Sequence, residues 1–175
     1  GLGDVYKRQT FESAEGIGTT FVIRVPFKID LDADKREESK DVSEKSIKGM
    51  HVLLAEDNEL NMEIAEFLLQ NEGAEVTKAW NGQEIVELFR KSEAGEFDVI
   101  LMDIMMPIIN GYEAAKRIRS LDREDAKKIP IIAMTANAFT EDRIRAKEAG
   151  MDEHVAKPID VELLIKVIHK LVKHN

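Results

Sequence analysis

The chain has 175 residues, 43% hydrophobic and 34% charged, which is enough apolar material for one globular domain and a smaller segment. Its 34 acidic and 25 basic residues give a formal net charge of −9, which argues against a nucleic acid partner because phosphate contacts need basic residues. The absence of cysteine excludes disulfides and thiolate metal sites, and no apolar run reaches the length of a membrane helix. We therefore expect no nucleic acid partner, no direct membrane contact in this fragment and a cytoplasmic location.

The first 28 residues divide into two pieces. Residues 1–9 show no periodicity and resemble a translated assembly scar, and because the chain does not begin with Met we expect a fragment of a longer product. Residues 13–28 predict a strand after a glycine-rich turn, with Phe21, Ile23 and Val25 on one face. Their pattern S-x-x-G-x-G-T-x-F resembles the last glycine box of the ATP-binding domain of sensor histidine kinases. The other motifs of that domain are absent from the sequence, so we expect a poorly packed remnant that does not bind ATP.

Residues 29–48 form a segment of different composition. Twelve of these twenty residues are charged, none is aromatic and no apolar stripe recurs. Such a segment cannot bury enough apolar surface to offset the entropy lost on ordering. We expect a solvated linker here, followed by the principal domain at 49–175.

From residue 49 onward, predicted strands and helices alternate. Apolar runs predict strands at 51–55, 97–102 and 131–134, and strand-like stretches predict two more at 74–79 and 153–156. Apolar residues at helical spacing predict five helices: one through 60–68 that ends at Gly73, one marked by 85–89, one through 114–121, one at 143–149 and one through 164–171. This alternation is typical of an α/β fold with parallel strands joined by right-handed crossovers. We predict a doubly wound, flavodoxin-like five-stranded parallel sheet of order 2-1-3-4-5.

Polar residues stand where four of the predicted strands end. The third strand runs directly into Asp103, the first into Glu56 and Asp57, the fourth into Thr135 and the fifth into Lys157. Each has an ordinary explanation when taken singly. Asp103 could form a turn, Glu56 and Asp57 could be acids at the start of a helix, Thr135 a strand residue with a bonded hydroxyl, and Lys157 part of a solvated turn. In a sheet of order 2-1-3-4-5, however, the crevice between strands one and three brings the three acids together.

This combination of side chains has a specific chemistry. Three neighbouring carboxylates repel one another unless a cation offsets them, and all-oxygen ligands favour a hard divalent ion such as Mg²⁺. Lys157 adds a fixed positive charge and Thr135 a hydrogen bond. Carboxylates, metal, ammonium and hydroxyl together suit a phosphoryl group carried on one carboxylate.

Residues 49–175 resemble a response-regulator receiver domain, close to those at the C-terminal end of hybrid sensor histidine kinases. The matching stretches are LLAEDNELNMEIA, MDIMMPIINGYEAAKRIR, PIIAMTANA and AGMDEHVAKPI. The resemblance implies a two-component phosphorelay in which Asp103 is phosphorylated by a phosphohistidine donor, either the protein's own kinase core or a histidine phosphotransfer protein. It also implies that the domain promotes its own phosphorylation and dephosphorylation, that the full-length parent is a hybrid kinase, and that its source is bacterial.

The resemblance carries further roles to matching positions. Asp57, Asp103 and the backbone carbonyl of Met105 are expected to bind Mg²⁺ directly, and Glu56 through a metal-bound water. Thr135 and Lys157 are expected to bind the phosphoryl oxygens, which makes Asp103, Thr135 and Lys157 the catalytic set.

Two positions depart from the family pattern. Asn110 replaces a frequent Asp in the loop before a helix, outside the acidic pocket. His154 replaces a frequent Tyr or Phe three residues before Lys157. We expect Thr135 and His154 to form the switch, with movement of the loop from Ala136 to Thr140 after phosphorylation. None of the four histidines has metal-ligand spacing, so we assign none to zinc.

The same residues argue against three other functions or leave them open. A haloacid-dehalogenase-type phosphatase needs a second acid two residues after its nucleophile, where this chain has Met105. A DNA-binding regulator would need an output domain, and the sequence ends directly after the last predicted helix. A pseudo-receiver that serves only for docking is the alternative kept, although it predicts the loss of an acid, the Thr or the Lys.

Overall fold

The computed structural model describes residues 8–14, 16, 18–24, 46–136 and 140–172. Its contacts divide the chain into two units, Gly1–Asp41 and Val42–Asn175. The charged linker up to residue 45, the expected switch loop at 137–139 and His174 lie outside the described residues.

The first unit contains a β-hairpin. Strand β1 (Arg8–Ala14) pairs antiparallel with β2 (Gly18–Arg24), and Gly16 between them has a φ of 77°, a left-handed conformation that suits glycine. The strand predicted after the glycine-rich turn is therefore confirmed, whereas β1 was not predicted. Phe11 and Val22 are exposed. An isolated two-stranded hairpin is marginal in water, and the expectation of a poorly packed remnant stays a prediction.

The described part of the second unit contains a five-stranded parallel sheet. Its order is β4-β3-β5-β6-β7, which confirms the predicted order 2-1-3-4-5. The strands are β3 (His51–Ala55), β4 (Glu75–Ala79), β5 (Val99–Asp103), β6 (Ile131–Thr135) and β7 (Glu153–Ala156). All residues of β5 and β6 are buried, as expected for apolar strands covered on both faces.

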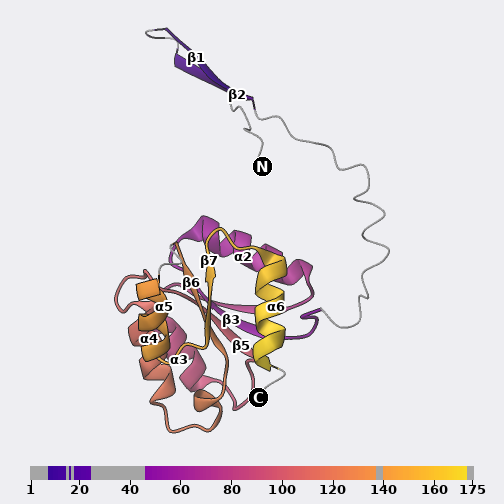
Figure 1. Ribbon diagram of the computed structural model, residues 1–175, viewed down its shortest axis with the longest axis vertical. Helices are drawn as coiled ribbons and strands as arrows, with labels where there is room; N and C mark the ends of the chain where they lie inside the picture. The colour runs from indigo at the N-terminus through magenta and orange to yellow at the C-terminus, as the bar shows by residue number, and fades with distance from the viewer. Residues whose placement is uncertain (1–7, 15, 17, 25–45, 137–139, 173–175) are drawn as a thin grey trace. The chain divides into compact units, whose positions relative to one another are not determined.

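Helices cover both faces of this sheet (Figure 1). One face packs against α2 (Glu59–Asn71) and α6 (Val161–Val172), and the other against α3 (Gly82–Lys91), α4 (Gly111–Arg119) and α5 (Thr140–Glu148). Ile47, which the sequence assigned to the charged linker, is fully buried in the core on the α2 and α6 face. Within the described residues, no helix combines the length and apolar character needed to cross a membrane.

Asparagine caps start three of the helices. The side chains of Asn58, Asn81 and Asn110 precede α2, α3 and α4 and each accept a hydrogen bond from the backbone N–H three residues later. The departure at Asn110 is thereby explained, because asparagine caps a helix as well as aspartate does.

The predicted end of α4 was wrong. Leu121 lies beyond Arg119, where the helix ends, and its N–H donates to the carbonyl of Ile118 in a tighter turn. The short 3₁₀ helix η1 (Asp125–Lys127), which follows, was not predicted.

Candidate functional site

The polar strand ends meet at one edge of the sheet. Glu56 and Asp57 directly follow β3, Asp103 and Thr135 are the last residues of β5 and β6, and Lys157 directly follows β7. Because these strands are parallel and adjacent in the order β3-β5-β6-β7, their carboxyl ends share that edge. The sheet thus brings together all five strand-end residues that the sequence singled out.

The three acids form a compact group. One carboxylate oxygen from each of Glu56, Asp57 and Asp103 lies within 4.8 Å of the others. Glu56 is 2% exposed and Asp103 6%, while Asp57 is exposed to solvent. Two of the three carboxylates are therefore buried, and solvent can reach the third.

Lys157 joins two of these acids. Its Nζ lies 2.5 Å from Oε2 of Glu56 and 2.8 Å from Oδ2 of Asp103. Buried carboxylates are costly unless they are paired, and one ammonium group pairs with both. Three carboxylates and one ammonium group give the site a formal charge of −2, and the carboxylates offer oxygen atoms as ligands. The residues present therefore fit a divalent cation such as Mg²⁺, which prefers oxygen ligands.

The pKa values of the bridge follow from burial and pairing. Burial raises the pKa of Asp103 above its ordinary value, although hydrogen bonding and charge from Lys157 oppose the rise. Burial lowers the pKa of Lys157, but its hydrogen bonds to Asp103 and Glu56 outweigh burial, and the net pKa is raised. Lys157 therefore stays an ammonium ion at neutral pH, while Asp103 is a more basic carboxylate than an exposed aspartate.

The loop after β5 supports Asp103. The backbone N–H of Met105 donates to Oδ1 of Asp103 at 3.2 Å, so the two carboxylate oxygens of Asp103 are held by Met105 and Lys157. The side chain of Met105 is 78% exposed. The role expected for the Met105 carbonyl stays a prediction.

The two expected switch residues line one cavity. Thr135 is buried at the end of β6, and His154 lies in β7 opposite Ala133. Both line a cavity of about 10 Å³ together with Tyr112, whose hydroxyl donates to Oδ1 of Asp142 at 3.5 Å. The end of β6, the start of α4 and the helix α5 therefore all border this small cavity.

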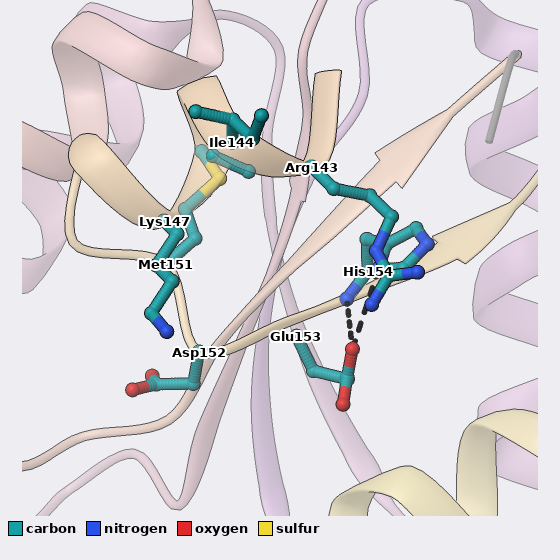
Figure 2. A pocket seen from close by; sticks show the side chains of 8 residues that line it. Arg143, Ile144, Lys147, Met151, Asp152, Glu153 and His154 are labelled. Carbon is teal, nitrogen blue, oxygen red and sulfur yellow. Dashed lines mark hydrogen bonds and ion pairs between the residues drawn. The ribbon is translucent and has the colours of Figure 1, made fainter. Parts of the chain in front are cut away.

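A larger groove of about 510 Å³ lies between α5 and β7. In Figure 2, Ile144 and Lys147 project from α5, and Glu153 turns toward His154, whose Nδ1 lies 3.3 Å from Oε1 of Glu153. Arg143 and His154 line both the groove and the smaller cavity. The groove is therefore next to the cavity that contains Thr135.

The structure adds one residue that the sequence did not single out. Nδ2 of Asn61, in the first turn of α2, donates to Oε1 of Glu56 at 3.0 Å. Its spacing from Asn58 was the available signal, because side chains at the third helical position reach back toward the cap. Glu56 therefore has a side-chain partner on each carboxylate oxygen.

Comparison with known proteins agrees with this geometry. Residues 52–169 match the family described as response regulator receiver domain. The chain is 34% identical to histidine kinase 1 of Arabidopsis thaliana over 161 residues, which cover 75% of this chain and 13% of that protein. It is 40% identical to hybrid signal transduction histidine kinase I of Dictyostelium discoideum over 120 residues, 67% of this chain and 7% of that protein. The chain thus spans a small part of these relatives, and their plant and amoebal sources do not support the expected bacterial one.

Solved structures give the same result. The receiver domain of the sensor histidine kinase PA1611 from Pseudomonas aeruginosa, with a magnesium ion coordinated in the active site cleft, superposes with a TM-score of 0.64 at 34% identity, over 71% of this chain and 98% of that domain. The receiver domain of the Saccharomyces cerevisiae response regulator Ssk1, crystallised with the histidine phosphotransfer protein Ypd1, gives a TM-score of 0.62 at 28% identity, over 72% of this chain and 90% of that chain. This chain belongs to the response regulator receiver domain family.

Proposed function

We propose that this domain is the phosphoacceptor of a two-component phosphorelay and receives a phosphoryl group from a phosphohistidine onto Asp103. The observation that carries the proposal is the bridge of Lys157 between Glu56 and Asp103, with the exposed Asp57 carboxylate beside it. Asp103 becomes the nucleophile, Lys157 and Thr135 bind phosphoryl oxygens, and Glu56, Asp57, Asp103 and Met105 form the metal site.

The transfer needs little chemistry from the protein beyond positioning and charge. A carboxylate oxygen of Asp103 attacks phosphorus, the P–N bond to the histidine breaks, and its electron pair returns to the imidazole nitrogen. The products are an acyl phosphate on Asp103 and a free histidine. Lys157 offers its ammonium to the phosphoryl oxygens, and its raised pKa keeps it charged throughout. Contacts from Met105 and Lys157 fix the orientation of the Asp103 carboxylate before attack.

The proposed metal is Mg²⁺. Asp57, Asp103 and the carbonyl of Met105 would hold it, with Glu56 acting on its water shell. Bound there, Mg²⁺ supplies neutralisation of the charge on the transferring phosphoryl group.

The proposed switch starts at Thr135. After transfer, its hydroxyl turns toward a phosphoryl oxygen on Asp103, which changes the packing of the small cavity shared with His154 and Tyr112. The groove between α5 and β7 adjoins that cavity and is the surface that a partner would read (Figure 2). Phosphorylation thus shifts the population of a surface that already exists.

A protein donor is favoured by the surface around the acids. Leu60, Ile64 and Phe67 recur at helical spacing along α2, directly after Asp57, and all three are exposed. Large exposed apolar side chains that cluster together mark interaction surfaces. The proposed donor is a histidine phosphotransfer protein or the kinase core of the same protein.

The longer product is proposed to be a hybrid histidine kinase in the cytoplasm. In that organisation, residues 13–28 derive from the kinase ATP-binding domain, residues 1–9 are an artefactual start, and the segment at 29–48 links the remnant to the receiver. The resemblance of the glycine-rich motif at 13–21 supports this arrangement. A pseudo-receiver used only for docking is not supported, because the three acids, Thr135 and Lys157 are all present and together.

A small P–N donor tests the proposed transfer. The protein is incubated with phosphoramidate and Mg²⁺, treated with borohydride, which converts an aspartyl phosphate to homoserine, and digested for peptide mapping. We expect homoserine at position 103 and unchanged aspartate at every other aspartate position. Modification elsewhere, or none in a folded protein, would refute the proposal.

A further inference from the structure

Glu56 has an unusually complete set of partners for a carboxylate at a metal site. It is 2% exposed, Oε2 lies 2.5 Å from Nζ of Lys157, and Oε1 accepts from Nδ2 of Asn61 at 3.0 Å. The backbone N–H of Asn58 lies 3.4 Å from the same Oε1. A buried carboxylate takes the orientation that its donors set, because water is not there to replace them.

The side chain of Asn61 is itself held in place by the start of α2. Asn58 is the N-cap, and its Oδ1 accepts from the backbone N–H of Asn61 at 3.0 Å. Helical side chains lean toward the N-terminus, so the amide of Asn61 reaches back to Glu56, five residues earlier. Capping is thus performed by the side chain of Asn58, and the side-chain amide of Asn61 is available for Glu56.

We propose that Asn61 is a positioning residue for the metal and phosphoryl site, acting through Glu56. By holding Oε1, it keeps Oε2 on Lys157 and so fixes the ammonium between Glu56 and Asp103. The inference rests on the proposed function of this site and extends it to a residue that touches neither metal nor phosphoryl group.

Loss of the Asn61 amide has a defined consequence. Oε1 of Glu56 would keep only the long contact to the N–H of Asn58, and the carboxylate would rotate to share Lys157 between its two oxygens. This rotation would displace the Lys157 ammonium from its 2.8 Å contact with Asp103. It would also loosen the orientation of Glu56, the acid proposed to act on the water shell of the metal. Removing a residue that hydrogen-bonds to a metal ligand typically lowers metal affinity by about 10- to 100-fold. Asn61 hydrogen-bonds to Glu56, which is itself proposed to act only on the water shell of the metal, so we expect Mg²⁺ affinity to fall by about tenfold or less.

The test is a Mg²⁺ titration by isothermal calorimetry on the 175-residue chain. Asn61→Ala removes the amide, and the nearly isosteric Asn61→Leu separates hydrogen bonding from lost packing. Asn71→Ala, at the exposed opposite end of α2, is the matched control. We expect both Asn61 variants to bind Mg²⁺ several-fold more weakly and Asn71→Ala to bind as the wild type does. The Mg²⁺ concentration for half-maximal phosphorylation by acetyl phosphate should rise equally, with the rate at saturating Mg²⁺ changed less.

A double-mutant cycle tests whether Asn61 acts through Glu56. In the Glu56→Ala background, Asn61→Ala should change Mg²⁺ affinity by less than about twofold, because the group it positions is gone. A several-fold loss in that background overturns the inference, as does unchanged affinity in Asn61→Ala and Asn61→Leu when the wild type binds Mg²⁺. If the wild type itself binds no Mg²⁺, the proposed metal site fails and this inference fails with it. If the wild type binds Mg²⁺ and the Asn61 variants bind it equally well, only the inference about Asn61 fails.

Discussion

Replacing Gly111 by alanine tests how tightly α4 is seated on the phosphoacceptor strand. A Cβ atom at Gly111 would lie 2.2 Å from the carbonyl oxygen of Asp103 and 3.0 Å from Cα of Ile104. Asp103 cannot retreat easily, because β5 lies between β3 and β6 and pairs with both. The start of α4 must therefore move, which strains the hydrogen bond from the Gly111 N–H to the Ile104 carbonyl.

The magnitude follows from the size of the clash. The Cβ must move by about 1 Å to reach an acceptable contact, and overpacking of this kind costs about 1–3 kcal/mol. The better helix propensity of alanine returns less than about 1 kcal/mol. We expect a net loss of about 1–2 kcal/mol in the free energy of unfolding, or roughly 3–10 °C in Tm for a domain of this size.

Urea unfolding and the rate of Asp103 phosphorylation by acetyl phosphate measure the two consequences. Gly82→Ala is the matched control, because Gly82 also begins a helix and its Cβ would lie 2.3 Å from the Ile109 carbonyl. Ile109 belongs to a loop that can yield, so Gly82→Ala should cost less stability than Gly111→Ala. Wild-type stability and an unchanged phosphorylation rate in Gly111→Ala would refute this reasoning.

Three further predictions concern the second unit. Arg123→Ala should cost about 2–3 kcal/mol in urea unfolding, and Arg123→Lys should recover only part of it. The reason is that the guanidinium donates to three backbone carbonyls, one in the last turn of α3 and two just after it, and pairs with the carboxylate of Asp125. Asp125→Asn should cost about 1 kcal/mol at neutral pH. The hydrogen bond from Arg123 lowers the pKa of Asp125, so the stability that the Asp125 carboxylate contributes is fully present above its ordinary pKa of 3.8 and is lost as pH falls through the lowered pKa. Urea unfolding at several pH values should show the difference in unfolding free energy between the wild type and Asp125→Asn shrinking in that range. A difference that stays constant with pH would contradict this linkage. Thr135→Ala should still be phosphorylated on Asp103 but should lose the phosphorylation-dependent NMR shift changes at the α5 and β7 groove; full wild-type changes would exclude Thr135 as the switch.

The strand ends were predictable because two separate signals agree. Apolar runs marked three of the strands, and residues whose chemistry is costly inside a core followed directly on strands, as at Glu56, Asp103 and Lys157. Parallel topology then required these residues to share one edge of the sheet. The fold, its strand order and the grouping of the acids followed without any contact being known.

Other features depend on contacts that periodicity does not encode. Ile47 stands in a charged segment, and only the complete core on the α2 and α6 face shows where it packs. The role of Asn61 depends on the direction of one side chain, and that of Arg123 on carbonyls about 30 residues away in sequence. Strand β1 lacks an alternating apolar pattern, so its pairing with β2 was not visible in the sequence.

In the proposed function, Asp103 accepts a phosphoryl group in a site that needs Mg²⁺. The most direct measurement is the intact mass of the protein after incubation with acetyl phosphate, with Mg²⁺ or with EDTA, beside Asp103→Asn. We predict a gain of one phosphoryl group that requires Mg²⁺ and is absent from Asp103→Asn. No gain in a protein shown to be folded, or an equal gain in Asp103→Asn, would contradict the account.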